Sequence, residues 1–191
     1  MPIICPNNPD GSISAITTES TVYSFAYDVF GNRTASYADG NLLASYVYAD
    51  NNGKLISVDY GNGFSIRYTY DTLDRIVGVR YNNGSEVYSY SYNEEGNLTS
   101  HTDTLAGYRY LYSYDLRGRM TSAHADPLVT GRMAYSFSYT YDEDDRVTET
   151  RFTLGELCYS YKPTYDADGA VTSYSYAKVA ICGGTYTFLH Y

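Results

Sequence analysis

The chain has 191 residues and a formal net charge of −9, with 26 tyrosines, 6 phenylalanines and no tryptophan. This length suffices for one domain with a core of its own. The acidic balance opposes binding to phosphate backbones, so we expect no nucleic-acid partner. No run of 18 apolar residues occurs, so we expect no insertion into a membrane.

The N-terminal segment, residues 1–9, contains three prolines and predicts an irregular arm. From residue 10 the chain predicts one β domain that extends to residue 191. Ile13, Ala15 and Thr17 alternate with polar neighbours as a strand does, and they precede the first regular unit.

A short tyrosine-rich motif then recurs along the chain, most clearly as Tyr-Ser-Tyr-Asp-Leu-Arg-Gly-Arg-Met at Tyr112–Met120. Its second tyrosine stands at positions 27, 48, 70, 92, 114, 141 and 165, in steps of 21, 22, 22, 22, 27 and 24 residues. A regular period of this size indicates a repeat architecture. We interpret these residues as the structural motif: Tyr27, Asp28, Gly31, Tyr48, Asp50, Gly53, Tyr70, Asp71, Tyr92, Gly96, Tyr114, Asp115, Gly118, Tyr141, Asp142, Tyr165, Asp166 and Gly169.

Each copy predicts an aromatic strand, a turn, a less aromatic strand and a second turn. In the fourth copy Tyr88, Tyr90 and Tyr92 face one side and the intervening serines face the other, because strand side chains alternate. Neighbouring copies should place such rings side by side, where cross-strand aromatic pairs contribute roughly 0.2–1 kcal/mol each.

The first turn depends on the Asp that follows the second tyrosine, whose carboxylate folds back onto nearby backbone N–H groups. Three residues later a glycine supplies a positive φ. Asp74 and Asp145 replace that glycine in two copies, and we expect them to adopt the same left-handed conformation. The second turn carries hairpin signals such as Asn62-Gly63 and Asn83-Gly84.

These elements predict an all-β fold of tandem antiparallel β-hairpin repeats, about fourteen strands in all. An open sheet rarely exceeds ~10 strands without curling or closing, so we expect a long curled meander, an arc or a partial hollow shell. The chain begins and ends mid-repeat, with Gly183–Phe188 opening a further aromatic strand. We therefore expect a fragment of a longer repeat protein, whose open sheet edges would permit self-association.

The pattern Tyr-x-Tyr-Asp-x-x-Gly-Arg-Met with a period near 22 resembles the YD repeat of the Rhs family, from about residue 10 to residue 191. That family includes bacterial Rhs and wall-associated proteins, the B and C components of insecticidal toxin complexes, and animal teneurins. The resemblance implies a hollow β-shell that is secreted or displayed at the cell surface and often encloses a toxic C-terminal domain. No signal peptide is visible in residues 1–20.

The sequence also departs from family members that release cargo, which end in a conserved segment with an autoproteolytic aspartate. Here Asp126-Pro127 lacks the following glycine and lies mid-chain, so we interpret it as a loop. About seven repeats are too few for the full shell that the resemblance implies. A partial shell, an arc or an assembly of several copies is expected instead.

The acidic and histidine side chains could act in catalysis or metal binding, but each also has a purely structural interpretation. The acidic run Asp142–Asp145 predicts a solvated hairpin turn, with acid–base work or a weak Ca²⁺ site as alternatives. His101 and His124 lie 23 residues apart and are expected to be neighbours across the sheet. Since no nucleophile motif accompanies them, we predict no catalytic residue, no metal and no cofactor.

The tyrosine face is expected to be mostly core. Tyr37, Tyr60 and Tyr81 lie near turns or edges, and we expect them to be exposed and able to stack on a ligand. Cys158 and Cys182 stand about one repeat apart and would pair in a disulfide; the alternative is that they and Cys5 are small buried hydrophobes.

The function predicted is a non-catalytic structural scaffold, a YD-repeat segment of a bacterial surface or secreted Rhs-like protein. Its partners would be the remaining repeats of a longer chain, an enclosed toxin or cargo domain, or neutral glycans. The alternative is a carbohydrate- or protein-binding module that uses exposed tyrosines. A hydrolase built on acidic residues is a third and weaker hypothesis.

Overall fold

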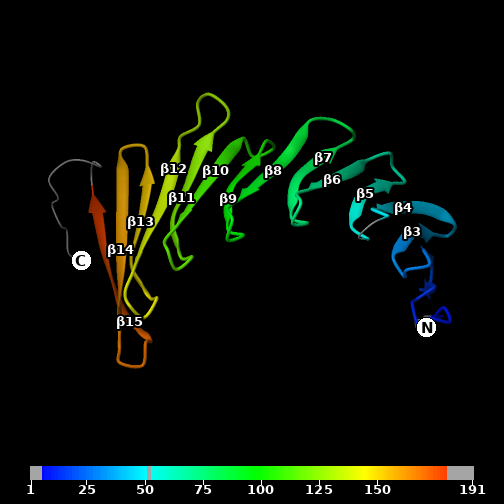
Figure 1. Ribbon diagram of the computed structural model, residues 1–191, viewed down its shortest axis with the longest axis horizontal. Helices are drawn as coiled ribbons and strands as arrows, with labels where there is room; N and C mark the ends of the chain where they lie inside the picture. The colour runs from blue at the N-terminus through cyan, green and yellow to red at the C-terminus, as the bar shows by residue number, and fades with distance from the viewer. Residues whose placement is uncertain (1–5, 51–52, 180–191) are drawn as a thin grey trace. The chain divides into compact units, whose positions relative to one another are not determined.

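The computed structural model describes residues 6–50 and 53–179, in which the chain forms fifteen β-strands and no helix (Figure 1). The chain divides into two compact units, Met1–Val87 and Tyr88–Tyr191, and each is considered by itself. Within each unit the strands follow one another in chain order and pair antiparallel with their sequence neighbours. The predicted all-β fold of tandem hairpins is confirmed.

The strands are short, from three to nine residues. In the first unit they are β1 (Ala15–Thr17), β2 (Val22–Tyr27), β3 (Arg33–Ala38), β4 (Asn41–Tyr48), β5 (Leu55–Tyr60), β6 (Ser65–Tyr70) and β7 (Ile76–Tyr81). The remaining strands are β8 (Glu86–Tyr92), β9 (Leu98–Asp103), β10 (Tyr108–Tyr114), β11 (Met120–Pro127), β12 (Tyr135–Tyr141), β13 (Val147–Leu154), β14 (Leu157–Tyr165) and β15 (Val171–Val179).

A β-bulge faces the second tyrosine of every copy. In the fifth copy Ser113 pairs with Ser122 but Tyr114 pairs with Met120, which leaves Thr121 as an extra residue on β11. The extra residues are Thr34, Ile56, Val77, Thr99, Thr121, Thr148 and Thr172. A bulge leaves one residue outside the ladder and increases the local strand twist.

Aromatic rings stack in rows along the sheet, as the alternation predicted. The ring centroids of Phe137 and Phe152 lie 5.0 Å apart, those of Tyr108 and Tyr135 5.7 Å apart, and His101 stacks on Tyr110 at 4.4 Å. Offset and edge-on pairs at such spacings contribute about 0.5–1.5 kcal/mol beyond the area they bury. The rows therefore stabilise the association of successive hairpins.

The expectation of a tyrosine core needs correction, because only small side chains are deeply buried. Among the described residues no large side chain is less than 2% exposed. The buried residues are Ala35, Ala44, Val58, Val79, Ala125, Cys158, Ser36, Ser57, Ser65, Thr150 and Ser160. Each unit is a single sheet, so its tyrosines cover the backbone and one another and stay half-buried instead of filling the space between two layers.

The cysteines and the N-terminal arm are described only in part. Cys158 is 4% exposed and disulfide-bonded. The alternative hypothesis, a free and buried thiol, is therefore wrong for Cys158. Cys5 and Cys182 lie outside the described residues, and with them the predicted pairing of Cys158 with Cys182. Asn7, in the predicted arm, forms an isolated bridge with Ile13. The assignment of residues 10–191 to one domain stays a prediction.

Candidate functional site

In each unit, the candidate site is the edge of the sheet at which the Tyr-Asp turns of successive copies follow one another. In the first copy one carboxylate oxygen of Asp28, Oδ1, accepts hydrogen bonds from the N–H groups of Phe30 and Asn32, both at 2.9 Å. The N–H of Gly31 donates to the Asp28 carbonyl at 3.2 Å, with Gly31 at φ 85°. The same pattern recurs around Asp71, Asp115, Asp142 and Asp166.

The second copy differs from the motif because its turn is one residue longer. The N–H of Ala49 donates to the Lys54 carbonyl, and the N–H of Gly53 donates to the Ala49 carbonyl. Ala49 therefore occupies the position that Asp28 holds in the first copy, and the assignment of Asp50 to that position is corrected.

In three copies the residue that closes the turn is an arginine bound to the turn aspartate. The Nε–H groups of Arg75, Arg119 and Arg146 donate to Oδ2 of Asp71, Asp115 and Asp142 at 2.7, 2.7 and 2.8 Å. The carboxylates are thus held as acceptors of three or more hydrogen bonds each.

These hydrogen bonds shift the acidity of the turn carboxyls. The backbone N–H of Arg75, followed by its side chain, lowers the pKa of Asp71 despite partial desolvation. Burial raises the pKa of Asp115, but hydrogen bonds from the side chain and backbone of Arg119 outweigh it, so the net pKa lies below its ordinary value. The side-chain amide of Asn32 does the same for Asp28. The hydrogen bonds of the turn therefore favour the ionised form of Asp28, Asp71 and Asp115.

Within each unit, the hydroxyl of the second tyrosine ties its copy to the preceding strands, in six copies in all. The hydroxyl of Tyr141 donates to the Met120 carbonyl at 2.6 Å, and Met120 is the residue opposite Tyr114 at the preceding bulge. Equivalent bonds join Tyr27 to Ile13, Tyr48 to Arg33, Tyr70 to Leu55, Tyr114 to Leu98 and Tyr165 to Val147, at 2.8 to 3.0 Å. A bulge interrupts the ladder, and the next tyrosine supplies a hydrogen bond to the carbonyl beside it.

A cation from one turn lies over the tyrosine ring of the next. The guanidinium carbon of Arg119 is 4.6 Å from the ring centre of Tyr141, and that of Arg146 is 5.0 Å from the ring of Tyr165. Lys54 takes the same place over Tyr70, at 4.9 Å. Such contacts are attractive because the face of an aromatic ring is negative.

The same cations explain why two left-handed positions are Asp instead of Gly. Asp74 and Asp145 have φ of 69° and 64°, so the predicted left-handed conformation is confirmed. Asp74 pairs with Lys54 at 3.0 Å, and Asp145 pairs with Arg119 at 2.6 Å. The carboxylate thus compensates for a backbone conformation that costs L-residues roughly 1–2 kcal/mol.

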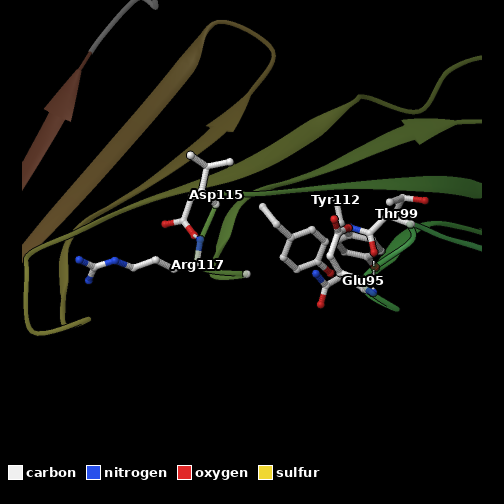
Figure 2. Close-up of a pocket in the computed structure, with 10 residues that line it drawn as sticks. Glu95, Thr99, Tyr112, Asp115 and Arg117 are labelled. Atoms are coloured by element: carbon white, nitrogen blue, oxygen red, sulfur yellow. Dashed lines mark hydrogen bonds between the residues drawn. The ribbon is translucent and has the colours of Figure 1, made fainter.

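Two turns are closed by asparagine instead, and beside each lies an open groove. The larger has a volume of about 610 Å³ and includes Asn97 and Tyr114 in its lining; Figure 2 shows its side chains. The smaller, of about 430 Å³, includes Asn32 and Tyr48. Sequence analysis did not identify these grooves. The sequence does mark them, because the residue that closes the turn is Asn in these two copies and Lys or Arg in four others.

The tyrosines predicted to bind a ligand are only partly brought together. Tyr60 is 39% exposed, whereas Tyr37 and Tyr81 are half-buried, so the expected exposure is wrong for the latter two. Phe64 contacts both Tyr60 and Tyr81, with ring centroids 5.9 and 5.1 Å away. Tyr37 pairs instead with Ser24 and Leu42. The three therefore form no common stacking surface.

The two histidines do not face each other. His101 pairs with Tyr110, which in turn pairs with Ala125, so the adjacent residue His124 points to the opposite face. Nδ1 of His101 lies 3.0 Å from the Tyr112 hydroxyl, and burial lowers the His101 pKa despite the nearby Asp103. Nε2 of His124 lies 2.8 Å from a carboxylate oxygen of Asp126. The expected proximity of the histidines is wrong.

The acidic run at Asp142–Asp145 is a turn in which the three aspartates are ion-paired. Asp142 and Asp144 bind Arg146 at 2.8 and 3.1 Å, and Asp145 binds Arg117 and Arg119. Within residues 6–50 and 53–179, no group of three or more His, Cys, Asp or Glu side chains is placed to hold a metal ion. The same residues include no helix long and apolar enough to span a bilayer.

Comparison with known proteins finds a protein-family match for part of this chain. The family model described as RHS Repeat matches residues 50–86 and 87–128. The tRNA3(Ser)-specific nuclease WapA of Bacillus spizizenii is 27% identical over 139 residues, which is 71% of this chain and 6% of WapA.

Solved structures share the fold. The crystal structure of TcdB2-TccC3-Cdc42 matches with a TM-score of 0.72 at 18% identity, over 86% of this chain and 10% of that one. TcdB2-TccC3 without its hypervariable C-terminal region matches with a TM-score of 0.73 at 16% identity, over 88% of this chain and 10% of that one. The chain thus spans a tenth or less of the proteins it resembles.

Proposed function

Because residues 50–86 and 87–128 are RHS repeats, as the YD-repeat resemblance predicted, we propose that this chain is a wall segment of a larger Rhs-like β-shell. Its role is mechanical: successive hairpins form a continuous surface that encloses cargo in a secreted or surface-displayed protein. The chain spans 6% of WapA and 10% of the matched TcdB2-TccC3 chains, which accords with a role as one segment of something larger.

The observation that carries this proposal is the bond from the second tyrosine's hydroxyl to a carbonyl of the preceding strands, which in five copies is the carbonyl at the preceding bulge. A tyrosine bond of this kind is formed in six copies, by Tyr27, Tyr48, Tyr70, Tyr114, Tyr141 and Tyr165, at 2.6 to 3.0 Å. A polar contact that repeats with the sequence period stabilises the junction between neighbours, as expected where each repeat contacts only its neighbours. The paired turn carboxylates likewise suit structural support and not proton transfer.

The test is to express the chain together with the sequence that flanks it in its gene and to image the particle by electron microscopy. A closed hollow particle whose interior is protected from protease would support the proposal. A compact solid particle, or a hydrolytic activity lost on Asp142→Asn or Asp144→Asn, would contradict it. The second variant is informative because Asp144 is exposed and contributes only one ion pair to the turn.

A binding module is a second candidate function, and the exposed Tyr60 favours it. Its ring lies beside Phe64, so an apolar face and a hydroxyl are offered together, as at many interfaces. A glycan array probed at low and at high salt tests it. Salt-insensitive binding to neutral sugars that is lost in Tyr60→Ala would support recognition, and binding that Tyr60→Ala leaves unchanged would rule this site out.

A further inference from the structure

The groove beside Asn97 occupies the place that an arginine fills in the next copies along the chain. Asn97 closes the turn of the fourth copy as Arg119 closes that of the fifth, since both N–H groups donate to the turn residue four positions earlier. Arg119 extends from there over the ring of Tyr141. The side chain of Asn97 is too short to reach over Tyr114 in the same way, and a volume of about 610 Å³ stays open there.

The cation that fills this place in the fifth copy has three kinds of contact. The guanidinium of Arg119 stacks on Tyr141, donates to the Asp142 carbonyl at 3.1 Å, and pairs with the Asp145 carboxylate at 2.6 Å. Arg146 repeats the ring contact over Tyr165. The site is therefore used for a cation at least twice in the second unit.

The open groove offers equivalents of each contact. Tyr114 and Tyr112 supply the aromatic lining, and the carbonyl of Asp115 corresponds to that of Asp142. Gly118 stands where Asp145 stands in the next copy, so the carboxylate must come from elsewhere. Glu95 lines the groove, and in the described part of the chain no ion pair engages it.

The one cationic side chain that lines the groove is directed elsewhere. Figure 2 shows Arg117 extending away from Tyr112, Thr99 and Glu95. Its guanidinium donates to Asp145 at 3.1 Å and to the Glu143 carbonyl at 3.2 Å, in the following turn. The part of the groove between Glu95 and the tyrosines is thus acidic and aromatic without a bound cation.

We propose that this groove binds the guanidinium group of an arginine side chain from another polypeptide segment, in the place that Arg119 takes within its own chain. Arginine fits better than lysine, because its planar group stacks on a ring while its N–H groups still reach a carbonyl and a carboxylate. A protein partner or cargo segment with an exposed arginine would be held at this edge of the sheet.

The experiment is an NMR titration of the full chain with N-acetyl-arginine-N-methylamide, with the citrulline analogue as a neutral control of the same shape. The Gly118 amide and the Tyr114 ring should shift in a saturable way with the arginine compound, with a dissociation constant on the order of millimolar for a single side chain. Citrulline should cause no saturable shift. Equal shifts with both compounds, or none with arginine, would overturn the proposal.

Two arginine substitutions, one inside the groove and one outside it, provide matched variants. Asn97→Arg recreates the residue found at positions 75, 119 and 146, so it should fold and fill the groove from within, abolishing the saturable shift. Asp168→Arg places the same side chain at an exposed turn position of the seventh copy, outside the groove, and should bind like the parent chain, because the turn bond at position 168 is made by the backbone N–H. Undiminished binding to Asn97→Arg, with an unchanged melting temperature as evidence of folding, would place the ligand elsewhere and refute the assignment.

Discussion

Removing the hydroxyl of Tyr141 tests the bond that joins neighbouring copies. In Tyr141→Phe the ring remains under Arg119, but the 2.6 Å hydrogen bond to the Met120 carbonyl is lost. Such a bond contributes about 0.5–1.5 kcal/mol net, and leaving a part-buried acceptor without its partner adds to the cost. We expect the free energy of unfolding to fall by about 1–2 kcal/mol.

The assay is thermal and urea unfolding followed by circular dichroism. For a chain of this size each kcal/mol corresponds to roughly 2–4 °C, so the midpoint should fall by about 2–8 °C. Tyr139→Phe is the matched control, because Tyr139 lies on the same face of β12 and its hydroxyl has no hydrogen bond among the described residues. Equal destabilisation by both variants would refute the idea that the bond at Tyr141 joins the copies.

Four further predictions concern the turns and the aromatic rows. Gly169→Ala should lower stability by about 1–2 kcal/mol through backbone strain alone, because φ at Gly169 is 82° and an added Cβ meets no atom within 4 Å. An unchanged melting temperature would contradict this. Stability should fall as the pH drops below about 4, because the folded-state pKa values of Asp28, Asp71, Asp115 and Asp142 are lowered. The stability that these carboxyl groups contribute is complete above their unfolded-state pKa of about 3.9. It is lost as the pH falls through their folded-state pKa values. Asp71→Asn should retain the turn, as Asn93 does naturally, and flatten this dependence in urea titrations at several pH values; an unaltered slope would exclude Asp71 as a contributor. Burial lowers the folded-state pKa of His101, so the unfolded chain binds the proton more strongly and stability falls as the pH drops below about 6.5. His101→Phe should remove this second loss of stability. The same free energy of unfolding for parent and variant at every pH between 7 and 5, in the same urea titrations, would refute it.

The turns could be predicted from the sequence because their physics is local. A carboxylate that accepts from N–H groups two and four residues later, and a residue with positive φ, involve only one short segment. The left-handed conformations of Asp74 and Asp145 followed in the same way from their place in the motif. The longer turn at Ala49–Lys54 was misassigned at Asp50, because one inserted residue changes which side chain meets the backbone.

What joins the copies required the tertiary structure. Whether the hydroxyl of Tyr141 meets a carbonyl depends on the register of neighbouring hairpins and on the extra residue of each bulge, and neither is encoded within one copy. The positions of His101 and His124 show the same dependence, since a shift of one residue in register exchanges the faces of a strand.

The sequence by itself determined the repeat, its strands and its turns, because alternation and turn chemistry act over a few residues. Only the tertiary structure decided that Lys54 forms an ion pair with Asp74, that Arg119 forms one with Asp145, and that a groove stays open beside Asn97. These contacts join residues 20 or more positions apart, so they exist only once neighbouring hairpins are aligned in register.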